Sequence, residues 1–279
     1  MKGFFNVNIW PKEPSSYSYQ HLYGILKKYI EPVGVYHLKD ENQLYFNTNI
    51  SPNITDLDYY FIIDNIWANY SYAHKLIESL KKKGTKVVVI TYDPPNFKQI
   101  DMLIADKLVD LVITFDKRFA NRFKPKTYIS DYIFNEDFFP IDNPTEYNNS
   151  VCIYGNMVPN MGKDNRYKLP IIDVPCIDYV ELYKRIQKYN GIHAFTTGYA
   201  EDEKTIVRYN KAKPIEALLC GRNPYCDPGL NYLCDSYNKY LKSSTLIPNP
   251  VQIDFDRTEM LQLNKNNIDN FIKEILYGI

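Results

Sequence analysis

The stretch Lys211-Ala-Lys-Pro-Ile-Glu-Ala-Leu-Leu-Cys-Gly-Arg-Asn-Pro-Tyr-Cys226 predicts a short helix with an abrupt start and a glycine stop, followed by a strand. Pro214 suits the first helical turn, where its missing N–H removes a donor that has no partner within the helix. Gly221 suits the position just after the last turn, where a left-handed backbone is common. We therefore expect a helix that begins at about Pro214 and ends before Gly221.

The start of this helix has the chemistry to hold an anion and a sugar. Free N–H groups and a partial positive charge favour phosphate there, and Lys211 and Lys213 add mobile cations. Glu216, in the first turn, supplies a carboxylate that accepts hydrogen bonds from a sugar diol. Together these residues predict a site for the diphosphate and ribose of a nucleotide-sugar, with the helix start open toward a cleft. The competing interpretation is an ordinary amphipathic helix.

The composition is that of a folded protein large enough for two domains. A chain of 279 residues, with 45% hydrophobic and 15% aromatic residues, has enough apolar side chains for two cores. Its net charge is zero, which argues against strong nonspecific binding to nucleic acid. Tyrosine is abundant, at 26 residues, and frequent Lys, Asn and Ile accompany it. This bias is typical of an AT-rich genome such as that of a virus.

The sequence predicts a cytoplasmic protein without a metal site. Its first residues lack the apolar core and cleavage site of a signal peptide, and no run of about 18 apolar residues could span a membrane. The cysteine spacings match no zinc pattern, so we expect reduced, buried thiols. All five lie in the second half of the chain: Cys152, Cys176, Cys220, Cys226 and Cys234.

Strand and helix patterns alternate in the first half, which predicts parallel strands joined by crossover helices. Strands are expected at 3–10, 33–38, 43–47, 58–64, 86–93, 111–115 and 127–129, and helices at 19–30, 72–83 and 97–107.

A polar run at 142–150 is a natural boundary between a first domain, 1–145, and a second domain, 146–279. In the second domain we expect strands at 151–156, 192–196 and 222–226. Helices are expected at 179–189, 231–241 and 258–277, besides the one opened by Pro214.

The stretch opened by Lys211 resembles the donor-binding helix of glycosyltransferases with the GT-B fold. Their motif runs from a basic residue through Pro or Lys to Glu-Ala-Leu/Met-Ala-x-Gly and a strand. Segments 109–115, 128–140 and 151–156 resemble, in turn, a closing strand of the first domain, the approach to the linker and the first donor-domain strand. The resemblance implies an α/β chain of two Rossmann-like, doubly wound domains with an interdomain cleft. In this fold the C-terminal helix often packs back on the first domain.

The resemblance also implies donor-binding residues. Glu216 matches the Glu that contacts the nucleotide ribose, and Arg166 resembles the basic residue that contacts the diphosphate. Gly155 and Asn156, at the end of the first strand of this domain, allow close approach of the backbone to phosphate. Arg208 stands where many retaining members carry a second Glu. It contacts the diphosphate or merely lies in a solvated loop, and the stereochemistry of transfer stays open.

The acceptor-side candidates come from the first half. Ligands of doubly wound sheets gather at the carboxyl ends of strands, where Asp64 and Asp93 stand. Asp93 is the first candidate for the base that takes the acceptor proton, because two prolines follow it and stiffen its loop; Asp64 is the second. The alternative for each is a helix cap. His21, Tyr17 and Trp10 surround the loop after the first strand, where an acceptor could approach, although a solvated surface position for His21 and packing for Tyr17 and Trp10 are the simpler interpretations.

The leading hypothesis is a metal-independent hexosyltransferase that uses a nucleotide-sugar, most simply a UDP-hexose, as co-substrate and needs no cofactor. Metal independence is implied by the resemblance, because the helix dipole and basic side chains replace the cation. The acceptor stays open between a glycan, a protein and a modified DNA base, since phage base glucosyltransferases share this fold. A noncatalytic nucleotide- or sugar-binding module is the alternative of another class. The missing G-x-G-x-x-G excludes a typical dehydrogenase, and the oligomeric state is open.

Overall fold

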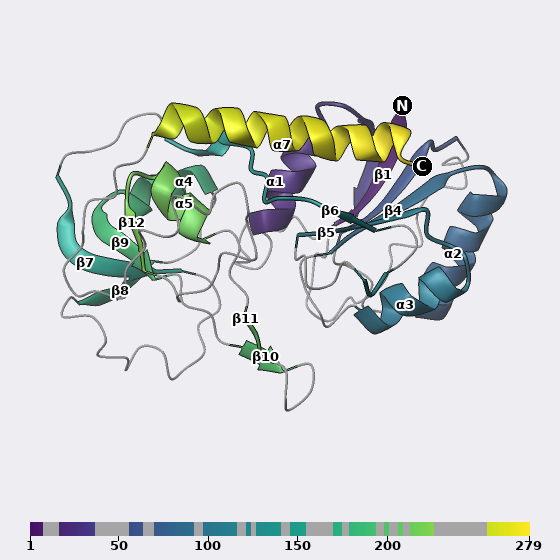
Figure 1. Ribbon diagram of the computed structural model, residues 1–279, viewed down its shortest axis with the longest axis horizontal. Helices are drawn as coiled ribbons and strands as arrows, with labels where there is room; N and C mark the ends of the chain where they lie inside the picture. The colour runs from purple at the N-terminus through teal and green to yellow at the C-terminus, as the bar shows by residue number, and fades with distance from the viewer. Residues whose placement is uncertain are drawn as a thin grey trace. The chain divides into compact units, whose positions relative to one another are not determined.

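A computed structural model describes residues 1–7, 17–36, 56–63, 70–91, 97–115, 121–123, 127–140, 146–154, 170–174, 179–193, 198–200, 206–208, 213–225 and 256–279 (Figure 1). The chain divides into two compact units. Unit 1 comprises Met1–Trp10, Tyr19–Ile133 and Asn266–Ile279, and unit 2 comprises Pro11–Ser18 and Phe134–Lys265. Unit 2 thus begins before the boundary expected after residue 145, and helix α7 (Arg257–Tyr277) contributes to both units.

Unit 1 contains a six-stranded sheet in which every described pair of strands is parallel. The strand order is β2-β1-β3-β4-β5-β6, one of the common orders of doubly wound sheets. The strands are β1 (Lys2–Val7), β2 (Glu31–Tyr36), β3 (Tyr59–Ile63), β4 (Lys86–Thr91), β5 (Leu111–Thr114) and β6 (Thr127–Ile129). The expectation of parallel strands with crossover helices is therefore confirmed for this unit.

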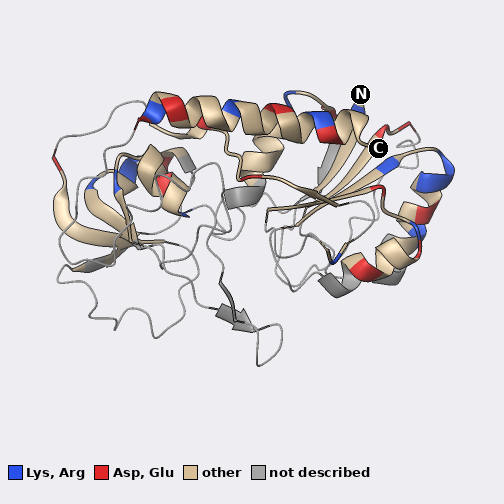
Figure 2. Ribbon diagram, in the orientation of Figure 1, with Lys and Arg blue, Asp and Glu red and all other residues tan. Residues whose placement is uncertain are grey.

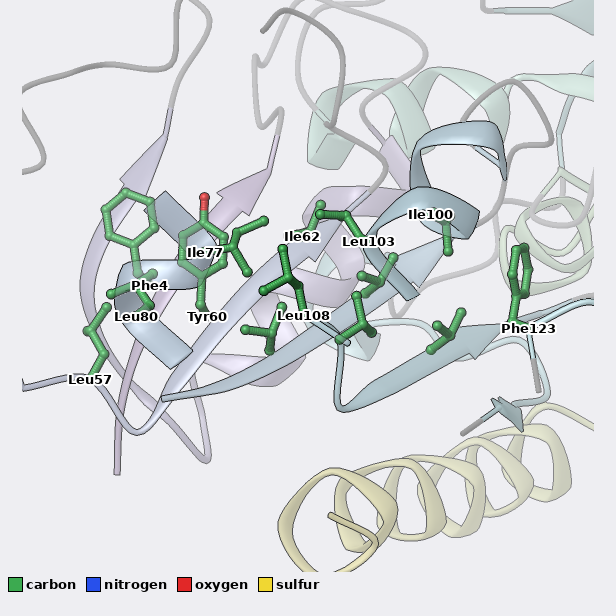
Figure 3. Close-up of a cluster of buried hydrophobic side chains, with 14 residues drawn as sticks. Phe4, Leu57, Tyr60, Ile62, Ile77, Leu80, Ile100, Leu103, Leu108 and Phe123 are labelled. Carbon is green, nitrogen blue, oxygen red and sulfur yellow. The ribbon is translucent and has the colours of Figure 1, made fainter. Parts of the chain in front are cut away.

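Helices cover both faces of this sheet, which explains why its central strands are apolar on both sides. Residues of β3 are all buried, and those of β4 are buried except at its first position. Helices α2 (Tyr70–Lys82) and α3 (Phe97–Ala105) lie over one face. Figure 3 shows the core beneath them, where Ile77 of α2 and Leu103 of α3 meet side chains such as Tyr60 and Ile62 of β3.

The opposite face of the sheet is covered by α1 (Tyr17–Leu26) and by the latter part of α7. The ring of Phe5 in β1 meets the Tyr23 ring of α1 edge to face, with centroids 5.3 Å apart. Phe115, just after β5, stacks on Phe271 of α7 at 6.4 Å. The Tyr59 hydroxyl donates to the carbonyl oxygen of Ile275 over 3.5 Å. Residues 266–279 are thus part of the unit 1 core.

Two helices of unit 1 end in the same left-handed turn, but with different residues. Gly84 closes α2 at φ 86°, and Lys107 closes α3 at φ 59°. At both ends the next residue donates its N–H to the carbonyl five positions earlier: Thr85 to Leu80 and Leu108 to Leu103. Lysine is strained in this conformation, whereas glycine is not.

Lys107→Gly is accordingly expected to raise the free energy of unfolding by about 1 kcal/mol. Gly84→Ala is the matched opposite, since a Cβ there meets nothing within 4 Å and only backbone strain is added. We expect it to lower stability by a similar amount. Denaturant titration of both variants measures the two changes, and equal stability of Lys107→Gly and the wild type would contradict this account of the turn.

Unit 2 contains a smaller parallel sheet of four strands in the order β12-β9-β7-β8. They are β7 (Asn148–Ile153), β8 (Ile171–Asp173), β9 (Tyr189–His193) and β12 (Asn223–Tyr225). Helices α4 (Tyr179–Ile186) and α5 (Lys213–Leu219) belong to the same unit, as do the short antiparallel strands β10 (Gly198–Ala200) and β11 (Ile206–Arg208) and the 3-10 turn Glu136–Phe138. The expected strand and helix pattern did not include β8, β10 or β11. Segments 43–47 and 231–241 lie outside the described residues.

Two close contacts fix the packing of unit 2. A Cβ on Gly191 of β9 would lie 2.5 Å from the carbonyl oxygen of Asn223 in β12, so only glycine fits between these strands. The second contact involves α7, where the side-chain amide of Asn264 is buried and forms hydrogen bonds with the backbone of Phe134. It accepts the Phe134 N–H over 3.0 Å and donates to the Phe134 carbonyl over 2.9 Å.

Candidate functional site

The candidate site lies at the carboxyl edge of the unit 2 sheet. After β7 the chain forms β8 on one side and then crosses to form β9 on the other, so the strand order reverses between β7 and β9. Ligands of doubly wound sheets bind outside the carboxyl ends of the strands at such a reversal. Tyr154 directly follows β7, and the side chain of Lys213 at the start of α5 reaches its backbone. The first turn of α5 therefore lies at this edge.

The local structure of α5 follows the sequence expectation. The helix begins at Lys213, places Pro214 in its first turn and ends before Gly221, whose φ is 68°. The Gly221 N–H bonds the carbonyl of Leu218, and the Arg222 N–H bonds that of Ala217, each over 2.8 Å. These two hydrogen bonds satisfy carbonyl groups in the last turn of the helix and direct the chain into β12. The helical start and the glycine stop are both confirmed.

Glu216 is the charged residue at the centre of the site, and it is almost completely buried, with 1% of its surface exposed. The Tyr154 hydroxyl donates to its Oε2 atom. Its Oε1 atom is also buried and has no hydrogen-bond partner among the described residues. The Tyr183 hydroxyl of α4 stabilises the ionised carboxyl as well. Two tyrosines from different elements thus enclose this carboxyl group.

Lys213 connects α5 to the end of β7. Its Nζ atom donates to the Tyr154 carbonyl oxygen over 2.6 Å and lies 4.8 Å from the centroid of the Tyr154 ring. The ammonium group is therefore held against Tyr154 by a hydrogen bond and a cation–π contact. Because its side chain is only partly buried, it brings positive charge to the rim of the carboxyl site.

Burial is the largest influence on ionisation at this site. It raises the pKa of Glu216 above the usual carboxyl value, while the hydrogen bond from Tyr154, the nearby Tyr183 hydroxyl and the charge of Lys213 act in the opposite direction. The pKa of Tyr154 is raised well above its usual value by burial and by the adjacent carboxyl, so the phenol keeps its proton and acts as the donor. Burial also raises the pKa of Cys152 to about 12.

One expectation about the helix start needs correction. We expected it to be open to a ligand, but Pro214 and Glu216 are both buried. The reason is that every residue of α5 from Pro214 to Leu219 except Glu216 is apolar, so this part of the helix packs into unit 2, and the Tyr154 hydroxyl bonds the carboxyl group there. Ligand access to Glu216 therefore requires a local opening.

His21 is also placed differently from the sequence interpretation, which located it on a helix surface near the first loop. Its side chain is fully buried in α1, and burial lowers its pKa to about 3. A neutral, enclosed imidazole of this kind is a core residue, and we do not assign it to an acceptor site.

The other predicted site residues are less informative. Arg208 ends β11 and pairs with Gly198, and Tyr17 is the first residue of α1; their side chains are not among those described. The remaining candidates lie outside the described residues: Trp10, Asp64, Asp93, Gly155, Asn156, Arg166 and Lys211. Of the expected buried thiols, Cys152 and Cys220 are confirmed as buried and free.

Tyr154 and Tyr183 are the site residues that sequence reasoning missed. Tyr154 had one detectable signal, its place within the predicted first strand of the second domain, 151–156. Tyr183 had none beyond its position on an amphipathic helix, because 26 tyrosines in the chain make any single one inconspicuous.

No protein-family model matches the chain, and no curated protein matches it. Within the described ranges, no helix has the length and apolar character needed to cross a membrane. No cluster of three or more potential metal-ligating side chains occurs among those same residues. Figure 2 shows acidic and basic residues interspersed along α7, in keeping with the zero net charge of the chain.

Proposed function

We propose that unit 2 binds a nucleotide-sugar and that the chain is a metal-independent glycosyltransferase of GT-B type, using most simply a UDP-hexose. The observation that carries this proposal is the Glu216 carboxyl group, buried at the carboxyl edge of a parallel sheet with one oxygen lacking a described partner. Such an atom lowers stability by about 1–3 kcal/mol. Its presence where doubly wound sheets bind ligands supports a functional role.

The donor would be held by two groups of α5. Glu216, when ionised, accepts hydrogen bonds from the ribose hydroxyl groups, for which Oε1 is available. Lys213, on the same turn, offers positive charge for the diphosphate and stabilises the nucleoside diphosphate as it leaves. Because Glu216 is enclosed, donor binding is coupled to an opening around the carboxyl, and we expect association slower than for a preformed pocket.

The acceptor would bind unit 1, with Asp93 or Asp64 as the base. Asp64 directly follows β3, and Asp93 follows β4 by two positions. These strands are neighbours and parallel, so their carboxyl ends meet at one edge of the sheet. A carboxylate there takes the proton from the acceptor hydroxyl as its oxygen attacks the anomeric carbon, and the bond from that carbon to the diphosphate breaks.

A thermal-shift screen against UDP-, GDP-, TDP- and CMP-sugars tests the proposal. We expect one class, the UDP-sugars first, to stabilise the chain by about 2.7 kcal/mol at a ligand concentration 100 times Kd. Slow release of UDP from that sugar should follow and should persist in EDTA. The absence of stabilisation by all four classes would contradict nucleotide binding. Loss of turnover in EDTA would contradict metal independence, and tight binding without turnover would favour a noncatalytic module.

A further inference from the structure

The two oxygens of the Glu216 carboxyl group are not equivalent. Oε2 accepts the hydrogen bond of the Tyr154 hydroxyl, whereas Oε1 has no hydrogen-bond partner in the described part of the chain. Glu216 is only 1% exposed, so bulk water cannot reach either oxygen and replace a missing hydrogen-bond donor from the protein. One oxygen is therefore held, and the other remains an acceptor without a donor.

Tyr154 is itself fixed from several directions. It directly follows the buried end of β7, and only 2% of its surface is exposed. Lys213 holds its carbonyl oxygen at 2.6 Å and lies over its ring. The second tyrosine near the carboxyl, Tyr183, is stacked against Phe139 with the ring centroids 4.3 Å apart. The Tyr154 phenol, which donates its hydrogen bond to Oε2, therefore has little freedom to rotate away from the carboxyl group.

We propose that Tyr154 is a positioning residue for the donor: its hydroxyl holds Oε2 of Glu216 and reserves Oε1 for a hydroxyl group of the ligand ribose. This inference rests on the proposed function, because it assigns a role to Tyr154 in the same site. It also gives Tyr154 a second effect. A donor hydrogen bond to the carboxyl favours its ionised form, which is the form that accepts hydrogen bonds from a sugar.

The direction of the pH effect follows from the groups that face the carboxyl. Tyr154 after β7, Tyr183 of α4 and Lys213 of α5 favour its ionised form, against the larger effect of burial; the Cys220 thiol after α5 keeps its proton, because burial raises its pKa well above the usual value. Ligand affinity should be full above the pKa of Glu216 and decline as the pH falls through it. Removing the Tyr154 hydroxyl raises that pKa further, so the decline moves to higher pH.

Calorimetric titration with UDP between pH 5 and 9 measures this effect for the wild type, Tyr154→Phe, Glu216→Gln and Tyr225→Phe. Tyr225→Phe is the matched control, since it removes a hydroxyl from another buried tyrosine of unit 2. The UDP phosphate also titrates in this pH range, so UDP affinity depends on pH even without Glu216. The pH dependence of each variant is therefore compared with that of the wild type. We expect Tyr154→Phe to bind UDP about ten-fold more weakly at pH 7, with its midpoint at higher pH. Tyr225→Phe should match the wild type, and Glu216→Gln should lose the protein's contribution to the pH dependence.

A second replacement covers the case in which Tyr154→Phe does not fold. 3-Fluorotyrosine at position 154 keeps the hydroxyl and makes it a stronger donor, so the midpoint should move to lower pH. An unchanged midpoint in a folded position-154 variant, with UDP binding retained, overturns the role of Tyr154 and leaves the proposed function standing. If the folded wild type binds no UDP at any pH, the proposed function fails and this inference fails with it.

Discussion

Glu216→Ala is expected to weaken UDP binding about 100-fold, because it removes the carboxylate that accepts the ribose hydroxyl groups. Charge-assisted hydrogen bonds are roughly twice as strong as neutral ones, and a water-excluded site strengthens them further. Glu181→Ala is the control. Glu181 is another carboxyl of unit 2, but it is partly exposed and pairs with Arg185 one turn away, over 2.9 Å. Titration calorimetry of both variants measures the difference, and equal UDP affinity in Glu216→Ala and the wild type would remove the assignment.

The stability of Glu216→Gln separates a lost ligand contact from a damaged fold. Burial raises the pKa of Glu216 in the folded chain above its unfolded value. The folded state therefore holds its proton to higher pH than the unfolded state, and stability falls as the pH rises from the unfolded pKa through the folded one. An amide does not ionise, so Glu216→Gln should melt at a higher temperature than the wild type at pH 8, with the difference shrinking toward pH 4. Weakened UDP binding in a more stable variant could not be ascribed to unfolding.

Asn264→Leu is expected to lower the free energy of unfolding of unit 2 by about 3 kcal/mol. The Asn264 amide satisfies both the N–H and the carbonyl group of Phe134, at 3.0 and 2.9 Å. Leucine fills similar space but leaves both backbone groups buried without these partners, and each loss is worth about 1–3 kcal/mol.

The control for this prediction is Asn270→Leu, the same substitution at an exposed position of the same helix. It should change stability by less than about 0.5 kcal/mol. Denaturant unfolding followed by circular dichroism measures both variants. Equal effects of the two substitutions would show that the Asn264 contact with Phe134 is of no special importance.

The sequence was most informative where local chemistry decides the structure. The β-branched run of β4 predicts a buried strand, and Pro214 and Gly221 predict the ends of α5 to within a residue or two. By contrast, β8, β10 and β11 have only three residues each, too few for a periodic pattern. Their pairing depends on partners elsewhere in the chain.

The site was harder to predict because its central contact joins residues far apart in the sequence. The residue type and helical position of Glu216 mark it as a candidate, but its burial depends on Tyr154, 62 positions earlier. The hydrogen bonds between Asn264 and Phe134 span 130 positions. Local patterns do not contain such pairs. For the same reason the helical pattern around His21 gives no sign that its imidazole is enclosed.

The most direct measurement is a crystal structure of the chain with bound UDP. If the account is correct, the ribose hydroxyl groups lie within hydrogen-bonding distance of Oε1 of Glu216, Tyr154 still holds Oε2, and the diphosphate lies near Lys213. UDP bound away from the carboxyl edge of the unit 2 sheet, with Glu216 still enclosed, would contradict this account.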